Sequence, residues 1–414
     1  MYVLVHRGCH QIGGSMIEVG TAHTRLLLDV GTNLPPLDDT PTKDTFTLEG
    51  LTCGEPSFDG VLISHHHGDH CGLTNRVLPQ IPIYTGKETA QILRVIADFT
   101  GQDIPKLEPI LQEGHTFSLG EIQITPIAVE HSAREAFMFL LQAEEKTLLY
   151  TGDYRGGAEI PAKVQTLLSA QPLDLLISEG TNIQRGKLPA GKKGLDEDGI
   201  CEKVVELADQ YDGTIFVLAS ATNEPRIQTI QKAAAKSGRL VCEDLFQTVV
   251  RNHANKRNIQ RFVAFGMTKE KSPRIFPYFE ELHAQRQLLG AKSLAKLPQK
   301  KIIFVRDSMA DFIETYLSCC KKRLHHVLIY SVWQGYKVTT QKISFLNSCR
   351  GMELDVVDFH CSGHASPAEL ESLIRHLEPK TLIPVHCEAE HRDAFLEMYH
   401  NCRMLTDGER WEIV

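Results

Sequence analysis

The residues with the clearest chemical potential lie together at 64–70, where the sequence reads SHHHGDH. Neutral imidazoles and carboxylates are good ligands for zinc and similar divalent ions, at roughly 2 Å. His65 and His67 are two residues apart, so in an extended segment their side chains point to the same side. Asp69 and His70 follow a glycine that suits a tight turn. This spacing predicts ligands for two metal ions, and the alternative is a polar surface loop rich in histidine.

Four more polar residues each come directly after an apolar run that reads as a β-strand. In that position a strand emerges into a cleft, although a single residue of this kind is often only a turn or cap residue. Together with the histidine cluster they predict one set of ligands and supporting groups. They are Asp29 in LLLDVG, His131 in IAVEHS, Asp153 in LLYTGD and His386 in TLIPVH.

The elements that must position these residues change in kind along the chain. The first 180 residues contain many short apolar runs that end in Gly or Asp, which predicts strands, with one helix over 86–100. From about residue 197, strand and helix patterns alternate, which predicts a parallel α/β layer. Residues 354–413 continue as strand, helix, strand and helix, the last helix covering 388–400.

Composition limits the classes of protein that fit. The 414 residues, of which 42% are hydrophobic, suffice for two or three domains. We find neither a run of about 18 apolar residues nor a basic segment followed by a long apolar run, so we expect no membrane span and no signal peptide. The eleven cysteines form no C-x-x-C pair, which favours a reduced, cytoplasmic protein without a disulfide framework.

The charge is unevenly distributed. A net charge of −8 would normally argue against nucleic acid as a partner. Residues 181–350, however, contain 28 Lys and Arg against 16 Asp and Glu, so the negative excess lies in the flanks. A basic middle between acidic flanks predicts two domains with different partners, and the alternative is an ordinary lysine-rich surface.

The order of these residues resembles the metallo-β-lactamase superfamily, whose motifs match Asp29, the 65–70 cluster, His131 and Asp153. Three further segments resemble the accessory motifs of the β-CASP nucleases. Within that group, ATNEPRIQ and SGHAS are similar to ribonuclease J. The three segments are SEGTN at 178–182, SGHAS at 362–366 and PVHCE at 384–388.

The resemblance covers nearly the whole chain and implies an α/β fold. The expected architecture is a metallo-β-lactamase αββα sandwich over 1–180 and 355–414, with an inserted parallel α/β β-CASP domain over 181–354. Ribonuclease J proteins usually continue into a C-terminal domain, for which we find no counterpart after PVHCE. A homodimer is left open.

The resemblance also implies two Zn²⁺ ions, with Mn²⁺ and Mg²⁺ as alternatives. Metal binding lowers the pKa of water to about 7, which makes a nucleophile at neutral pH. Asp29 would orient a ligand without binding metal itself. The implied ligands are His65, His67 and His131 for one ion, Asp69, His70 and His386 for the other, and Asp153 between them.

Catalysis would involve Asp69, Glu179 and His364. His364 should protonate the leaving oxygen, with Glu179 orienting it or tuning its pKa. The alternative for His364 is a buried histidine bonded to the backbone. Ser362, His364 and Ser366 are candidates to hold a substrate phosphate, and Ser366 is equally suited to cap the following helix.

Two residues of ATNEPRIQ, Asn223 and Arg226, are predicted to bind phosphate at a strand-to-helix turn, with helix capping as the alternative for Asn223. Trp333 and Tyr336 either stack on bases or pack.

We therefore expect a zinc-dependent nuclease for single-stranded nucleic acid, acting as a 5′–3′ exonuclease, an endonuclease or both. RNA is favoured over DNA because relatives with histidine at the position of His386 are mostly RNA enzymes. The alternatives are a DNA nuclease of the same fold, a small-molecule hydrolase such as a lactonase or thioesterase, and a non-catalytic nucleic-acid-binding subunit.

Overall fold

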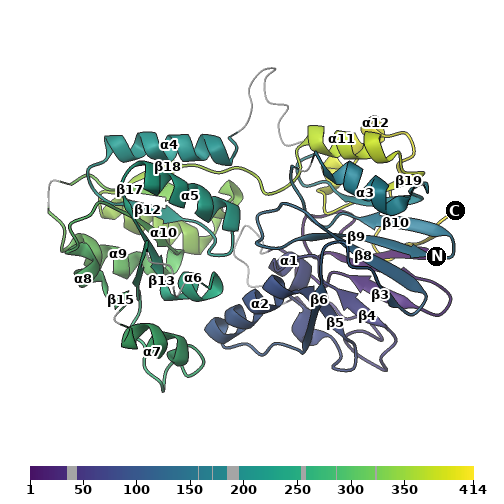
Figure 1. Cartoon of the computed structure of the whole chain (residues 1–414), viewed down its shortest axis with the longest axis horizontal. Coiled ribbons are helices and arrows are strands. Elements are labelled where there is room, and N and C mark those ends of the chain that lie inside the picture. The colour runs from purple at the N-terminus through teal and green to yellow at the C-terminus, as the bar shows by residue number, and fades with distance from the viewer. Residues whose placement is uncertain are drawn as a thin grey trace.

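The structure is a computed structural model that describes residues 1–34, 44–156, 158–169, 171–183, 195–252, 258–285, 287–321 and 324–414. The strands in these ranges form three sheets, in two units that lie side by side (Figure 1). Two sheets face each other in the first unit, which we call the sandwich. The third sheet is the centre of the other unit, which we call the third-sheet unit.

The first sheet of the sandwich is antiparallel from β20 to β3 and parallel from β3 to β6. In order across the sheet, its strands are β20 (Arg410–Glu412), β1 (Tyr2–Arg7), β2 (Met16–Gly20), β3 (Arg25–Leu28), β4 (Gly60–Leu62), β5 (Ile83–Gly86) and β6 (Leu107–Leu111).

The second sheet of the sandwich is parallel from β19 to β10 and antiparallel from β10 to β7. In order across the sheet, its strands are β19 (Thr381–Val385), β11 (Leu175–Glu179), β10 (Lys146–Tyr150), β9 (Phe137–Ala143), β8 (Ile122–Ala128) and β7 (Phe117–Leu119).

Apolar side chains of the two sheets meet in one buried cluster that includes Val5, Leu28, Phe139 and Ile177. The helix α2 (Lys87–Thr100) packs on the outer face of the first sheet. Three helices pack on the outer face of the second sheet. The layers are therefore helix, sheet, sheet, helix, as predicted for this unit. The three helices are α3 (Ile160–Leu168), α11 (Pro367–Leu377) and α12 (Ala394–Met398).

The third sheet is parallel throughout. Its central strands are continuous apolar runs buried on both faces, which is typical of parallel sheets covered by helices. In order, the strands are β15 (Leu288–Leu289), β14 (Ile259–Phe262), β13 (Leu240–Asp244), β16 (Lys301–Val305), β12 (Ile215–Leu218), β17 (Val327–Tyr330) and β18 (Asp355–Asp358).

Helices cover both faces of this sheet. On one face lie α4 (Glu197–Gln210) and α5 (Glu224–Lys236). On the other lie α8 (Ala291–Ala295), α9 (Ala310–Leu317) and α10 (Thr340–Gly351). The two short helices α6 (Leu245–Val250) and α7 (Phe276–Ala284) face the sandwich near α2 (Figure 1). The layered α/β architecture confirms the predicted fold class.

The third-sheet unit interrupts the sandwich, because β11 precedes it and β19 follows it in the second sheet. We propose that it is an inserted domain. The strand β18 pairs with β17, so residues 355–358 belong to the third sheet, and we place the end of the insertion after them rather than at residue 354.

The prediction of one helix over 388–400 is wrong. The segment forms a short 3-10 helix, Ala389–His391, and then α12. Arg392 lies between these two helices and is buried. Its guanidinium donates to the Leu405 carbonyl at 2.8 Å and lies 2.9 Å from His10 Nδ1. Within the ranges given above, no helix is both long and apolar enough to span a membrane.

Candidate metal centre

The predicted ligands lie where strands of the two facing sheets end. Parallel strands present their carboxyl ends at the same edge of a sheet, so these residues meet although they are far apart in sequence. Asp29 follows β3, and the histidine cluster follows β4 and runs into the short helix α1 (Gly68–Cys71). His131, Asp153 and His386 follow β8, β10 and β19, and Glu179 is the last residue of β11.

Three imidazole nitrogens converge in the first ligand group. Nε2 of His65 lies 3.0 Å from Nδ1 of His67, and Nε2 of His131 lies 3.2 Å from the same nitrogen. Nitrogen ligands about 2.0–2.1 Å from a tetrahedral ion lie about 3.3 Å apart. The three rings therefore fit around one ion, with a further coordination position left over.

The second ligand group consists of Asp69, His70, Asp153 and His386. Nε2 of His386 lies 3.3 Å from Asp69 Oδ2, and Nε2 of His70 lies 3.2 Å from Asp153 Oδ2. The same oxygen of Asp153 lies 3.8 Å from His65 Nε2 in the first group. Asp153 thus stands between the two groups and faces both.

The surroundings of Asp153 indicate whether the two ligand groups fit a metal. Both of its carboxylate oxygens are buried and neither accepts a well-formed hydrogen bond within the described residues, although Oδ2 has ion-pair contacts of 3.2 and 3.8 Å with His70 and His65. Nε2 of His70 likewise makes no well-formed hydrogen bond among these residues. Buried carboxylates without partners are costly, and they are usually paired or bound to a metal. The donor set of imidazoles and carboxylates suits zinc and other divalent cations.

In His65, His131 and His386 the other ring nitrogen is held by the protein, which fixes the ring orientation. His131 Nδ1 donates to the carbonyl of Gly363 at 2.7 Å. Nδ1 of His65 lies 3.0 Å from Ser64 Oγ, and Nδ1 of His386 lies 2.9 Å from a threonine hydroxyl, Thr181 Oγ1. Nε2 of these rings is thereby left to face inward.

Asp29 is fully buried behind this centre and binds four donors. Its oxygens accept hydrogen bonds from the backbone and hydroxyl of Ser64 at 2.7 and 2.8 Å. They also accept from Tyr150 Oη and His70 Nδ1, each at 2.7 Å. Asp29 has a φ of 61°, a left-handed conformation that Asp adopts more readily than most residues. The carboxylate therefore orients ligands and its own oxygens are already occupied.

Burial sets the protonation of the rings. Burial, reinforced by the neighbouring imidazoles, lowers the pKa of His65 and of His131 well below the ordinary histidine value. Both rings are neutral at pH 7, the form that binds metal. Burial also opposes the charge on His70, but the surrounding carboxylates, led by Asp153, outweigh it and raise the pKa of His70 well above its ordinary value.

His364 and Glu179 form a pair beside the second group. His364 Nδ1 donates to Glu179 Oε2 at 3.1 Å and lies 3.6 Å from Asp153 Oδ2. Backbone N–H groups of Tyr154, Thr181 and Ala365 donate to the Glu179 carboxylate and fix it. Burial lowers the pKa of His364, but the Glu179 and Asp153 carboxylates outweigh burial and raise this pKa to about 9. His364 is therefore protonated at neutral pH.

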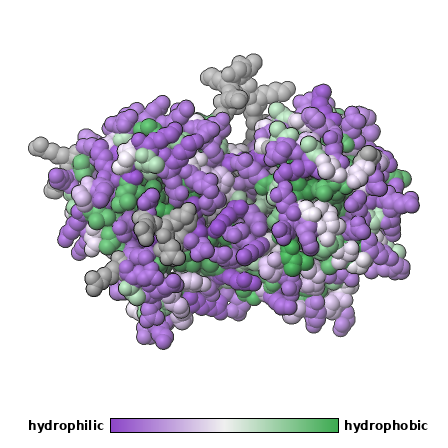
Figure 2. All heavy atoms as spheres, viewed as in Figure 1, coloured by the Kyte–Doolittle hydropathy of each residue, from purple (hydrophilic) through white to green (hydrophobic). Residues whose placement is uncertain are grey.

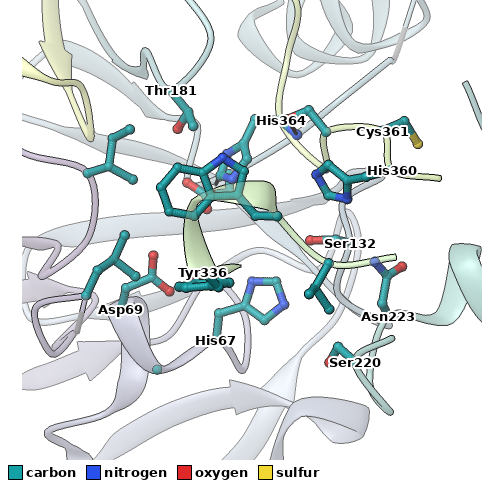
Figure 3. Close-up of a pocket in the computed structure, with 18 of the residues that line it drawn as sticks. His67, Asp69, Ser132, Thr181, Ser220, Asn223, Tyr336, His360, Cys361 and His364 are labelled. Atoms are coloured by element: carbon teal, nitrogen blue, oxygen red, sulfur yellow. Dashed lines mark hydrogen bonds and ion pairs between the residues drawn. The ribbon is translucent and has the colours of Figure 1, made fainter. Parts of the chain in front are cut away.

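A cavity of about 580 Å³ gives access to these residues. Its wall includes His67, Asp69 and His364, together with Ser220 and Asn223 from the third-sheet unit (Figure 3). The cavity thus lies between the two units. Hydrophilic side chains line much of the junction of the units on the face shown in Figure 2.

The predicted phosphate-binding residues lie in different places. Ser362 lines the cavity, and its hydroxyl accepts from the His364 backbone at 3.2 Å. Asn223 also lines the cavity, while its Oδ1 caps α5. Ser366 caps α11 in a capping box with Glu369, and it lies outside this cavity.

Arg226 has a different role from the predicted one. Its side chain is fully buried, so a substrate phosphate cannot reach it. The guanidinium donates to both Glu197 oxygens at 3.0 and 3.2 Å, to the Phe359 carbonyl at 3.3 Å and to the Cys361 sulfur at 3.0 Å. Arg226 therefore fixes the segment that leads from β18 to His364.

Several supporting residues were not singled out from the sequence. Ser64, Tyr150 and Thr181 bind the ligands or Asp29 as described above. The amide of Asn182 donates to Ser362 Oγ at 2.9 Å and to the His364 carbonyl at 3.1 Å. Thr181 and Asn182 lie in the SEGTN motif, which was a usable signal, whereas nothing local marks Tyr150.

Two family models match parts of the chain. Residues 25–217 match the beta-lactamase superfamily domain. Residues 351–403 match the Zn-dependent metallo-hydrolase RNA specificity domain.

Curated relatives carry ribonuclease J names. Ribonuclease J of Sinorhizobium meliloti is 22% identical over 82% of this chain and 59% of its own length. Ribonuclease J of Helicobacter pylori is 21% identical over 98% of this chain and 60% of its own length. The chain thus spans about three-fifths of the length of these relatives.

A solved structure has the same fold. The crystal structure of a protein of unknown function from Enterococcus faecalis V583 matches 99% of both chains with a TM-score of 0.74 and 22% sequence identity.

Proposed function

We propose that this chain, which belongs to the metallo-β-lactamase superfamily and to its β-CASP, ribonuclease J-like branch, is a metal-dependent hydrolase of phosphodiester bonds that acts on RNA. The observation that carries the proposal is the position of Asp153. Its carboxylate is buried, accepts no well-formed hydrogen bond within the described residues, and has Oδ2 3.8 Å from His65 in the first group and 3.2 Å from His70 in the second. A pair of cations is the simplest complement to this arrangement.

The first ion would be held by His65, His67 and His131, and the second by Asp69, His70 and His386, with Asp153 shared. We propose zinc for both because nitrogen ligands predominate. When bound, the ions would supply a water of lowered pKa as nucleophile and would neutralise charge on the phosphoryl oxygens.

The chain's own residues would supply the proton for the leaving group. His364 has Nδ1 bound to Glu179, which favours its protonated form, so its Nε2 is the atom that can donate. Glu179 is fixed by backbone N–H groups and cannot follow the substrate. A pair of this kind is suited to general acid catalysis, which typically contributes 10²–10⁴-fold.

The match of residues 351–403 to an RNA specificity domain and the names of the relatives support RNA as the substrate. A cavity between two units also suits a single strand that enters the junction. We propose 5′–3′ exonucleolytic cleavage as the first activity to measure, with endonucleolytic cleavage of the same RNA as the second.

The test uses purified protein with Zn²⁺ or Mn²⁺ and labelled single-stranded RNA and DNA that carry a 5′-phosphate or a 5′-hydroxyl. We expect cleavage of RNA, with mononucleotides released if the action is exonucleolytic. Asp153→Asn should lose activity together with bound metal, measured by mass spectrometry of the metal content. His364→Ala should retain metal and lose about 10²–10⁴-fold in kcat.

The matched control is His376→Ala, which removes an exposed histidine on α11 and should change neither property. Cleavage of DNA alone would favour a DNA nuclease. Hydrolysis of lactones or thioesters without cleavage of nucleic acid would favour a small-molecule hydrolase. Intact metal content in Asp153→Asn would contradict the assignment of that residue.

A further inference from the structure

The part of the cavity wall that comes from the third-sheet unit has no Lys or Arg side chain among its described residues. The third-sheet unit contributes Ser220, Asn223, Ser331, Trp333 and Tyr336, and no Lys or Arg occurs among the described residues that line the cavity. A track for the phosphates of a nucleic acid would need positively charged side chains. This wall is therefore suited to the uncharged part of a nucleotide.

Two aromatic rings dominate this wall. Trp333 and Tyr336 belong to the turn that follows β17, where the 3-10 helix η3 covers Gln334–Val338. Their ring centroids lie 5.2 Å apart with an interplanar angle of 87°. Both residues are half-buried, and both line the cavity. The two rings thus form a corner at which a planar group can contact one ring by its face and the other by its edge.

The corner is held in place by its surroundings. Tyr330 Oη donates to the Trp333 carbonyl at 3.1 Å. The indole packs directly over Gly335, where a Cβ atom would lie 2.2 Å from the ring, so a larger residue would displace it. Thr339 Oγ1 donates to the Tyr336 carbonyl at 2.9 Å and also caps α10. Rings fixed in this way lose little entropy when a ligand binds.

The corner lies next to the metal centre. Tyr336 is close to Asp69 and His67 in the cavity (Figure 3). Burial raises the pKa of Tyr336, and the Asp69 carboxylate adds to the effect, so the two side chains are electrostatic neighbours. A base placed on the rings would therefore belong to a nucleotide beside the phosphate at the metals.

We propose that Trp333 and Tyr336 form a nucleobase-binding subsite that holds one unpaired base adjacent to the scissile phosphodiester. The proposal rests on the proposed function and names its substrate more closely. A base held in the corner of these two rings cannot remain stacked and paired in a duplex, so the subsite selects single-stranded ends or loops. Stacking accepts every base, so we expect little sequence preference.

Tryptophan fluorescence tests the subsite without catalysis. The chain has two tryptophans, and the other, Trp411, lies on the edge strand β20 against Arg403. In a Trp411→Phe variant, Trp333 is the single reporter. We expect adenosine 5′-monophosphate to quench its emission, and ribose 5-phosphate, which lacks the base, to leave it unchanged. Tyr336→Ala should weaken the nucleotide by roughly 5- to 150-fold, and Tyr336→Phe should keep most of the affinity.

Cleavage gives a second readout. RNA with an abasic residue at the nucleotide next to the cleaved bond should be a poorer substrate, by roughly 5- to 150-fold in kcat/KM. Trp333→Ala should abolish that difference, and Trp333→Phe should retain it. Equal cleavage of both RNAs together with unchanged fluorescence would overturn the subsite while leaving the proposed function intact. Quenching by the nucleotide without cleavage of any phosphodiester would sustain the subsite and refute the proposed function.

Discussion

At the scale of single residues, Asp29 is placed to orient the candidate metal ligands without being one of them. Its two oxygens bind Ser64, His70 and Tyr150 and so join both ligand groups through one buried carboxylate. Groups that orient ligands in this way typically contribute 10- to 100-fold to metal affinity.

We therefore predict that Asp29→Asn lowers metal affinity by roughly 10- to 100-fold, because the amide presents an N–H group to donors that need an acceptor. Tyr150→Phe removes one donor and should have a smaller effect. Competition with a chelator of known affinity measures both variants. An Asp29→Asn protein with wild-type affinity would contradict this role.

We predict that Arg226 affects catalysis only by positioning the segment that carries His364. Arg226→Lys keeps the charge but loses the paired hydrogen bonds to Glu197 and the contact with the Phe359 carbonyl. The segment that carries His364 should shift, and a small displacement of a catalytic group can cost up to about 100-fold in rate. We expect kcat to fall by roughly 10- to 100-fold with metal content and KM unchanged.

The matched control is Arg251→Lys. Arg251 is a second buried arginine of the same unit, bound to Glu224 and Glu243 at 2.7 Å each, and it does not line the cavity. It should lose stability without a specific loss of kcat. Equal losses of kcat in both variants would mean that Arg226 only stabilises the fold.

The role of a residue can be predicted from the sequence when its partners are close in sequence, and not when they are distant. The candidate ligands could be recognised because metal geometry favours a short, local spacing such as that of His65, His67, Asp69 and His70. Arg226 was misjudged because its burial depends on partners more than a hundred residues away, such as Ser331 and Cys361. No spacing within ATNEPRIQ reveals those partners.

At the scale of elements, strands with continuous apolar runs were predictable and weak strands were not. The run IFVL of β12 is continuous, apolar and fully buried, so the sequence alone predicts this strand. The strand β20 has the sequence RWE, and β6 has the sequence LEPIL, so neither is a continuous apolar run. Both exist because a neighbouring strand already offers an edge, which is information from the tertiary structure.

The strand β2 also contains the clearest pH-dependent contribution to stability. Glu18 is buried; burial opposes its ionisation, but hydrogen bonds from His6, Arg25 and Tyr2 outweigh this and lower its pKa to about 2. A carboxylate with a lowered pKa stabilises the folded state fully above its unfolded pKa of about 4.3 and loses that contribution as the pH falls towards 2.

We predict that Glu18→Gln flattens the dependence of the unfolding free energy on pH between about 4.5 and 2, by at most about 3 kcal/mol. Urea denaturation of the metal-free protein at several pH values measures this, since metal loss in acid would otherwise interfere. Glu397→Gln changes an exposed carboxylate on α12 and should leave the profile as it is. A parallel offset at every pH would contradict the assignment.

At the scale of the whole molecule, the two units meet at the metal centre and also at a small apolar contact. Phe99 of α2 and Phe246 of α6 have ring centroids 4.9 Å apart at an interplanar angle of 63°. Ile92, Val95 and Val250 complete this contact. The contact joins α2 of the sandwich to α6 of the third-sheet unit.

We predict a coupling free energy of about 0.5–1.5 kcal/mol between Phe99 and Phe246, because aromatic pairs contribute this much beyond burial. Urea denaturation of Phe99→Ala, Phe246→Ala and the double variant provides the cycle. Additive effects of the two single changes would show that the rings do not interact. We also expect weaker RNA binding by each variant, since the cavity wall is shared by both units.

The order of strands in the second sheet has a consequence for how the protein is made. Translation must add the entire third-sheet unit after β11 before it reaches His364 and His386. Until β19 emerges from the ribosome, one side of β11 has unpaired backbone groups and Asp69 lacks its histidine neighbour. Under the proposed function, the ligand set of a nascent chain stays incomplete until β19 and His386 have been synthesised, so we expect cleavage of RNA to begin only after that point.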